Sequence, residues 1–349
     1  MSEADIAAAV LWIGVSAYAV LGGADFGAGL WDLVAGGAER GARARDLMDR
    51  AITPVWEANH TWLIFNLVVL WTAFPEAFGA IMTTLFVPLM LAALGIVLRG
   101  SGFAFRHVAR RLEHRRLLGA TFAFSSLLTP FFMGTAAGAI AAGEVEAGGG
   151  GEQFGSWTGT TPLLVGALFV AGSAFIAAVF LVRDARRGND AALAEYFRRR
   201  ALGSAAVTGV LAGAGILVLR SDARYVYDGL TSEALPLVAL SVVCGLATLV
   251  LLVRGAPRFT RPLAVGAFVA VIWGWGVAQY PYLLPESLTV DQAAAPSATL
   301  AALMIVFVAA VLLVVPALAL LFTLHQRTLL DEGSEADGET GDARQRPVG

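Results

Sequence analysis

Nine long apolar stretches, separated by short polar connections, run through this chain of 349 residues. A transmembrane helix needs roughly 20 mostly apolar residues. Charged residues make up only 15% of the chain, against about 25% in a soluble domain, so lipid must cover most of its surface. We predict an all-α polytopic membrane protein with two four-helix bundles and a peripheral helix. The predicted spans lie near residues 5–33, 52–74, 77–98, 117–142, 161–182, 201–219, 234–253, 262–281 and 298–324.

Arginine is distributed very unequally among the connections between these stretches. The chain has no lysine, and of its 24 basic residues the odd-numbered connections and the tail hold 22, whereas the even-numbered connections hold 2. Basic residues accumulate on the cytoplasmic side of membrane proteins. We therefore predict an outside N-terminus and a cytoplasmic C-terminus in a bacterial inner membrane. Because the arginines form no separate basic domain, nucleic-acid binding is not expected.

The ends of the apolar stretches suggest how the chain is organised. Residues 1–327 are predicted to form the transmembrane domain, and the acidic, glycine-rich segment 328–349 a disordered cytoplasmic tail. The aspartate in GNDAALAEYF is placed to cap a short helix that leads into the sixth span. The single cysteine, Cys244, excludes a disulfide framework or a cysteine-based metal site.

Two carboxylates lie inside predicted spans, where a charge is costly. Asp25 stands in GGADFGAGLWD, about 12 Å from the inner end of the first span, and Glu57 in ITPVWEANHTWLI, about 8 Å from the inner start of the second. Carboxylates placed in this way can relay protons from the cytoplasm. Asp25 could instead cap a helix that restarts after Gly22 and Gly23, or form an ion pair, and Glu57 could interact with the helix dipole.

The residues around these carboxylates also have alternative roles. Trp56 fits an interfacial position, whereas Trp62 lies deeper, in the core or against a partner. Asn59 and His60 give the start of the second span a polar surface that lipid would reject. His60 is the only intramembrane histidine, and a bond to a neighbouring polar group is favoured over haem ligation. Arg99 is expected to snorkel to the surface, with pairing to Asp25 or Glu57 as the alternative. The histidine spacing predicts no metal site.

Four segments together resemble one family. GGADFGAGLWD, ITPVWEANHTWLI, LRGSGFAFR and YPYLLPESLTV are similar to segments of subunit II of the cytochrome bd quinol oxidases, which include the cyanide-insensitive oxidases. The resemblance implies a subunit of a respiratory terminal oxidase that oxidises quinol, reduces dioxygen to water and generates proton-motive force. It implies no independent activity for this chain.

The resemblance also implies partners, cofactors and site residues. Haems b558, b595 and d are expected in the partner, subunit I, and no haem in this chain. Some relatives hold a structural quinone, and a small accessory subunit is left open. Glu57 matches an acidic position implicated in a proton channel, which is aspartate in the best-known members, and Asp25 matches the acidic residue of the glycine-rich motif. Trp62 matches a position near a dioxygen path proposed for some members.

The residues themselves also leave two other functional classes open. An ion-coupled secondary transporter would use Asp25 and Glu57 as its coupling carboxylates, and the glycine-rich break near Asp25 fits the broken helices of such proteins. A membrane scaffold without transport would tolerate loss of both carboxylates. A neighbouring gene for a haem-binding, nine-span partner would favour the oxidase.

Overall fold

The computed structural model describes residues 2–37, 40–52, 56–108, 112–314, 316, 317 and 320. The chain divides into two units, Met1–Pro296 and Ser297–Gly349. Eight described helices are long and apolar enough to cross a membrane, and a ninth span is obtained when the bent pair Asn59–Ala73 and Pro75–Thr84 is counted as one. The predicted all-α membrane fold is therefore confirmed. The predicted tail 328–349 lies outside the described residues.

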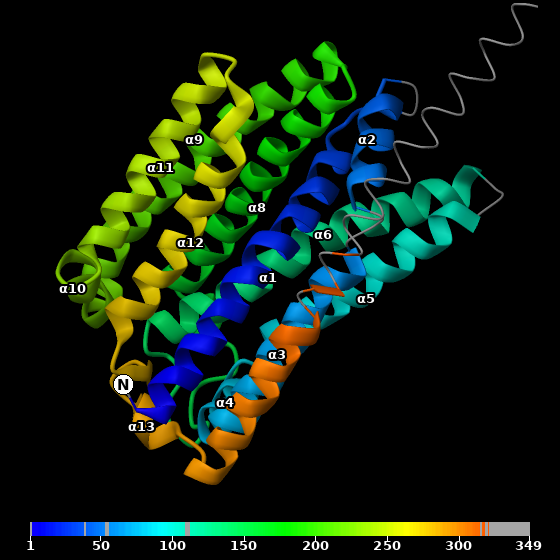
Figure 1. Ribbon diagram of the computed structural model, residues 1–349. Coiled ribbons are helices and arrows are strands. Elements are labelled where there is room, and N and C mark those ends of the chain that lie inside the picture. Colours follow the sequence, from blue (N-terminus) through cyan, green and yellow to red (C-terminus); the bar gives the residue numbers. More distant parts are fainter. Residues whose placement is uncertain are drawn as a thin grey trace, which may run out of the picture. The chain divides into compact units, whose positions relative to one another are not determined.

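The first unit contains two groups of four long helices, which can be followed in Figure 1. In the first group, α1 packs against α3 and α6, and α5 packs against α6; in the second, α8 packs against α9 and α12, and α11 against α9 and α12. Contacts of α8 with α1 and α6 join the groups. Their bounds are α1 Glu3–Leu33, α3 Trp56–Ala73, α5 Phe86–Val108, α6 Leu112–Ala141, α8 Thr160–Arg187, α9 Ala191–Asp222, α11 Leu235–Val253 and α12 Thr260–Gln279.

Short elements complete the first unit. The segment after α12 is an ordered loop, in which β1 pairs antiparallel with β2 and Thr289 caps α13. The second unit contributes a helix over Ser297–Val314, long and apolar enough to span a membrane. The remaining elements are α2 Ala42–Ile52, α4 Pro75–Thr84, α7 Gly155–Thr158, α10 Arg224–Thr231, the 3₁₀ turn Pro257–Phe259, β1 Tyr282–Leu284, β2 Leu288–Thr289 and α13 Val290–Ala293.

Two helix boundaries differ from the sequence prediction. The span predicted at 77–98 is wrong in its first third, because α4 ends at Thr84 and α5 begins at Phe86, and α4 bends by 119° from the preceding helix. Pro75 starts α4 without a side-chain cap. The alternative role of Asp25, as the cap of a helix that restarts after Gly22 and Gly23, is also wrong, since α1 is continuous from Glu3 to Leu33, as the span predicted at 5–33 requires. Packing of neighbouring helices there outweighs the low helix propensity of glycine.

The start of α9 follows the predicted cap. Asp190 accepts a hydrogen bond from the Leu193 N–H at 3.0 Å and pairs with Arg43 at 2.6 Å. The helix that it caps is continuous to Asp222, rather than a short helix before the sixth span.

Asp190→Ala is expected to lower the melting temperature of the protein, whereas Asp190→Asn, which keeps a capping oxygen, lowers it less. The Leu193 N–H, followed by the Arg43 charge, lowers the pKa of Asp190. This contribution to stability is present above the ordinary pKa of aspartate and is lost as the pH falls through the lowered value. Thermal unfolding of the three proteins between about pH 3 and pH 7 checks this. Equal melting temperatures at neutral pH would contradict the capping role.

Candidate functional site: a buried polar cluster on α1, α3, α5 and α6

Asp25 lies in the interior of the first helix group, with only 4% of its surface exposed. The amide Nδ2 of Asn59, on α3, donates a hydrogen bond to its Oδ2 at 2.6 Å and lies 3.4 Å from the carbonyl oxygen of Leu21. Asn59 is itself 3% exposed. Because a buried carboxylate is stable only with polar partners, this amide fixes the position of the carboxyl group between α1 and α3.

Arg99, on α5, is the largest fully buried side chain, at 2% exposure. Its Nη2 donates to the backbone carbonyl of Asp25 at 2.9 Å, and its Nη1 donates to the Ser126 hydroxyl on α6. The guanidinium carbon lies 4.6 Å from the ring centroid of Phe122 and 5.3 Å from that of Phe26. Hydrogen bonds and aromatic faces thus surround this cation with partners that a buried charge requires.

The prediction that the Arg99 side chain snorkels to the surface is wrong, because this side chain is buried. The alternative was that Arg99 pairs with Asp25 or Glu57. The structure brings Arg99 to Asp25, but through the backbone carbonyl and not the carboxylate, and the Glu57 side chain lies outside the described part of the chain, so pairing with Glu57 stays a prediction. Sequence reasoning also missed Ser126, Phe26 and Phe122. The serine pair Ser125 and Ser126, in an otherwise apolar run, could have identified α6 as the fourth helix that contributes to the buried cluster.

The glycines of α1 make room for these contacts. A Cβ added at Gly27 would overlap the backbone carbonyl of Ser173 on α8, and one added at Gly29 would overlap the Ser126 hydroxyl and lie 2.9 Å from Nη1 of Arg99. Small residues commonly allow such close approach between membrane helices, and here they bring α1 against α6 and α8.

Gly29→Ala is expected to destabilise the protein by about 1–3 kcal/mol, because its methyl group must displace Ser126 or Arg99 in a packed interior. Gly209→Ala on α9 is the matched control, since nothing lies within 4 Å of a Cβ added there. The melting temperature of each protein in the same detergent measures the difference. A Gly29→Ala protein as stable as the Gly209→Ala protein would contradict the tight packing.

His60 and Trp62 lie beside this cluster on α3. The His60 ring is half-buried, with centroid distances of 6.1 Å to Tyr18 and 6.2 Å to Phe26. Trp62 is also half-buried and packs edge-on against Phe65 at 5.8 Å. α3 begins at Trp56, but the side chains of Trp56 and Glu57 lie outside the described part of the chain.

The described residues offer no cluster of metal-ligating side chains. No group of three or more histidine, cysteine, aspartate or glutamate side chains comes together among them. Two cavities, of about 850 and 420 Å³, are lined by neither histidine, methionine nor cysteine in this part of the chain. Haem iron is most often held by one of these side chains, although tyrosine also serves as a ligand, and Tyr280 and Tyr282 line the smaller cavity.

What the buried cluster can do chemically follows from its groups. A carboxyl group can take up and release a proton, the Asn59 amide orients it, and the nearby Arg99 supplies a fixed positive charge. Such intramembrane groups mark ion pathways and proton relays in membrane proteins.

Comparisons with known proteins agree with this architecture. Residues 4–325 match the family described as cytochrome bd terminal oxidase subunit II. A Bacillus subtilis (strain 168) protein provisionally named cytochrome bd menaquinol oxidase subunit II is 22% identical over 93% of this chain and 96% of its own length. The cytochrome bd-I ubiquinol oxidase subunit 2 of Escherichia coli (strain K12) is 28% identical over 38% of this chain and 34% of its own.

The fold is also similar to that of a chain in the solved structure of the bd oxidase from Geobacillus thermodenitrificans. One of its chains superposes with a TM-score of 0.79 and 26% sequence identity, covering 93% of this chain and 98% of that one. The chain belongs to the cytochrome bd terminal oxidase subunit II family.

Proposed function

We propose that this chain is the non-haem subunit of a bd-type oxidase that oxidises quinol and reduces dioxygen to water. Its partner is the haem-bearing subunit I, and the complex lies in the bacterial inner membrane with the N-terminus of this chain outside and its C-terminus in the cytoplasm. Family membership supports the complex, and the arginine distribution supports the orientation. The comparisons give no support to the secondary-transporter alternative.

The buried cluster carries the second part of the proposal, which is a role in proton uptake. Water formation consumes protons at the dioxygen site, and quinol oxidation releases protons. Proton-motive force arises only when these protons are taken up from one side of the membrane and released on the other. The observation behind the role is the Asp25 carboxyl group, held by Asn59 at 2.6 Å within one helix group. A scaffold would gain nothing from a buried carboxylate and a buried guanidinium that packed apolar residues could replace.

The route runs from the cytoplasm to Asp25 through Glu57. Glu57 precedes Asn59 by two residues on α3, and Asn59 holds Asp25. Moving one charge across 100 mV of membrane potential is worth about 2.3 kcal/mol. Uptake from the cytoplasmic side therefore stores energy in proportion to the protons that this path delivers.

Purification of this chain together with its partner tests the oxidase assignment. We expect an absorption spectrum with bound haem and oxygen uptake that depends on added quinol. The same preparation without the haem-bearing partner should show neither property. A complex that contains no haem, or one that consumes no oxygen with either ubiquinol or menaquinol, would contradict the assignment.

Glu57→Gln is expected to lower quinol-driven oxygen uptake by about 10-fold or more, because glutamine cannot pass on a proton. The haem spectrum of the complex should stay unchanged. Thr61→Val, one turn further along α3, removes a polar group without removing an acid and serves as the control. Normal turnover in a fully assembled Glu57→Gln complex would exclude this residue from the path.

A further inference from the structure

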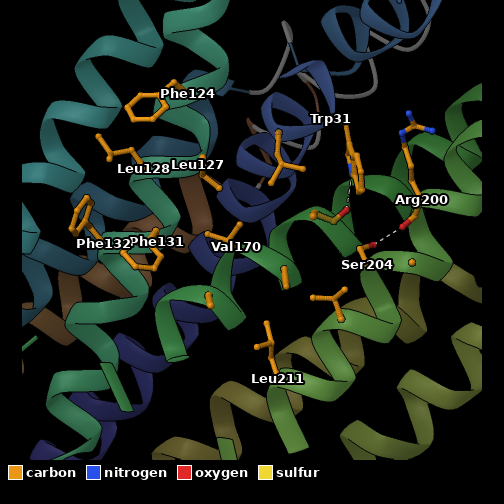
Figure 2. A pocket seen from close by; sticks show the side chains of 16 residues that line it. Trp31, Phe124, Leu127, Leu128, Phe131, Phe132, Val170, Arg200, Ser204 and Leu211 are labelled. Carbon is orange, nitrogen blue, oxygen red and sulfur yellow. Dashed lines mark hydrogen bonds between the residues drawn. The ribbon is translucent and has the colours of Figure 1, made fainter. Parts of the chain in front are cut away.

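A large apolar groove lies outside the proton cluster, between α6, α8 and α9 (Figure 2). Its volume is about 850 Å³, within the range of sites that bind small molecules. Phe124 and Phe131 of α6 line one wall, Val170 of α8 the floor, and Val207 and Leu211 of α9 the other wall. Along most of its length the groove therefore offers only hydrocarbon to an occupant.

One end of the groove is different, because Arg200, Trp31 and Ser204 meet there (Figure 2). The guanidinium carbon of Arg200 lies 3.4 Å from the ring centroid of Tyr196 and 5.7 Å from that of Trp31. Nε of Arg200 is buried without a hydrogen-bond partner, and Nη1 makes one long bond, of 3.4 Å, to the Tyr196 carbonyl. Within the described residues no carboxylate pairs with this arginine.

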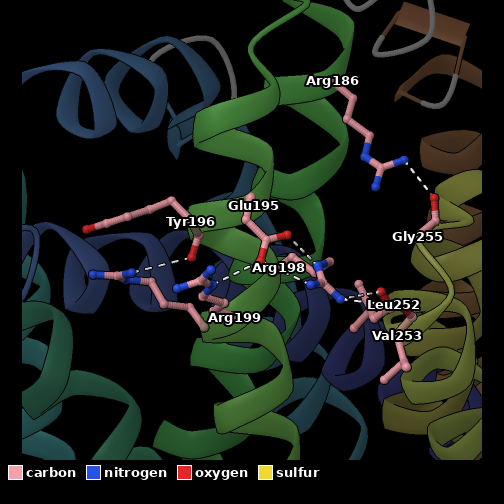
Figure 3. Close-up of polar contacts among 9 residues, drawn as sticks. Arg186, Glu195, Tyr196, Arg198, Arg199, Leu252, Val253 and Gly255 are labelled. Carbon is pink, nitrogen blue, oxygen red and sulfur yellow. Dashed lines mark hydrogen bonds and ion pairs between the residues drawn. The ribbon is translucent and has the colours of Figure 1, made fainter.

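The two arginines that precede Arg200, unlike Arg200 itself, are paired with a carboxylate. Arg198 and Arg199 both bind Glu195, at 2.6 and 2.9 Å (Figure 3). One glutamate thus serves the first two of three consecutive arginines, and the charge of Arg200 remains available at the end of an apolar groove. An arginine so placed favours an anion, and the adjoining groove favours a hydrocarbon chain.

The groove adjoins the apolar outer surface of α9, which Val207 shares with the groove lining. α9 exposes apolar side chains along its outer surface, with Val207 at 53%, Val210 at 71% and Leu217 at 72% exposure. In a membrane-spanning helix such a surface faces lipid. Lipid acyl chains therefore have direct access to the groove, and basic pockets between transmembrane helices bind anionic headgroups.

From these observations we infer that the groove binds one phospholipid with an anionic headgroup. The phosphate lies at the Arg200 guanidinium, and one acyl chain lies along the groove between α6 and α9, past Val207 to Leu211. The bound lipid supplies the acceptor that Nε of Arg200 lacks and fills a volume that packed side chains leave open. This inference does not depend on the proton path.

Lipid exchange in the intact complex tests the inference. The complex is washed in detergent and reconstituted with spin-labelled phosphatidylglycerol or spin-labelled phosphatidylcholine, and native mass spectrometry identifies what remains bound. We expect the complex to retain one phosphatidylglycerol and to prefer it to phosphatidylcholine by about fivefold, the ratio that corresponds to about 1 kcal/mol for one basic side chain near the membrane surface.

Variants separate the headgroup site from the groove. Arg200→Gln should abolish the preference, and Arg200→Lys should restore part of it. Arg199→Gln is the matched control, because that side chain is 77% exposed and bound to Glu195, and it should keep the preference. Val207→Trp should reduce retention of both lipids by filling the groove.

Three outcomes would overturn the inference. They are equal retention of the two lipids by the unmodified complex, equal loss of the preference in Arg199→Gln and Arg200→Gln, and a quinone or a segment of subunit I found in the groove. If Arg200→Gln fails to assemble with haem, the comparison of the two lipids in the unmodified complex decides by itself.

Discussion

Asp25→Asn is expected to lower quinol-driven oxygen uptake by about 100-fold, at the low end of what a positioned acid–base group contributes. Asparagine has nearly the same shape and keeps a carbonyl oxygen that can accept the hydrogen bond now made by the Asn59 amide at 2.6 Å. The substitution therefore removes the ability to carry a proton while leaving the packing of α1 against α3 in place. The haem spectrum and the yield of the complex should not change.

Asp32→Asn is the matched control for this variant. Asp32 lies on the same helix, is also a buried carboxylate at 8% exposure, and pairs with Arg45 at 2.8 Å. It lies in the last turn of α1, next to the arginine-rich segment that follows this helix, and not in the Asn59 cluster. We expect turnover close to that of the unmodified complex. Equal losses in the two variants would show that any missing carboxylate on α1 impairs the enzyme, and the specific role of Asp25 would be wrong.

Arg99→Met is expected to prevent most of the assembly of the complex. The guanidinium joins three helices by donating to the Asp25 carbonyl on α1 and to the Ser126 hydroxyl on α6. Each hydrogen bond from a charged donor is worth about 1.5–3 kcal/mol, so the loss of both bonds destabilises the protein by about 3–6 kcal/mol. That is a large fraction of the net stability of a typical protein. The yield of haem-containing complex per amount of membrane measures it.

Two further variants make the Arg99 prediction specific. Arg99→Lys keeps the charge but cannot reach two acceptors with one planar fork, so an intermediate yield is expected. Arg199→Met removes an exposed arginine and should leave the yield unchanged. A normal yield for Arg99→Met would show that the buried cation does not hold α1, α5 and α6 together.

The sequence predicted the helices well because the membrane imposes a length and a polarity on every span. Apolar runs and the arginines between them located most helices to within a few residues, although α5 begins at Phe86 and α9 at Ala191, well away from the predicted 77 and 201. The break between α4 and α5 was missed, because residues 77–98 are almost entirely apolar and their hydropathy does not show that a helix ends at Thr84 and another begins at Phe86. The continuity of α1 agrees with the single span predicted at 5–33, because its glycines pack closely against Ser173 and Ser126 instead of ending the helix.

The site was predictable only in part. Asp25 and Asn59 were selected because a polar side chain within a span is energetically costly and is usually functional. The structure brings the two side chains together. The burial of Arg99 could not be read from its position at the end of an apolar run, because it depends on Ser126, 27 residues further along. The groove at Arg200 depends on contacts among α1, α6, α8 and α9, which no local pattern encodes.

The claim that protons reach the dioxygen site through Asp25 is tested most directly by timing proton uptake. The reduced complex in liposomes is mixed with dioxygen, and charge movement across the membrane is recorded together with haem oxidation. In the Asp25→Asn complex we expect haem oxidation to begin normally while the charge movement that accompanies proton uptake slows by about 100-fold. Charge movement as fast as in the unmodified complex would show that protons enter by another route.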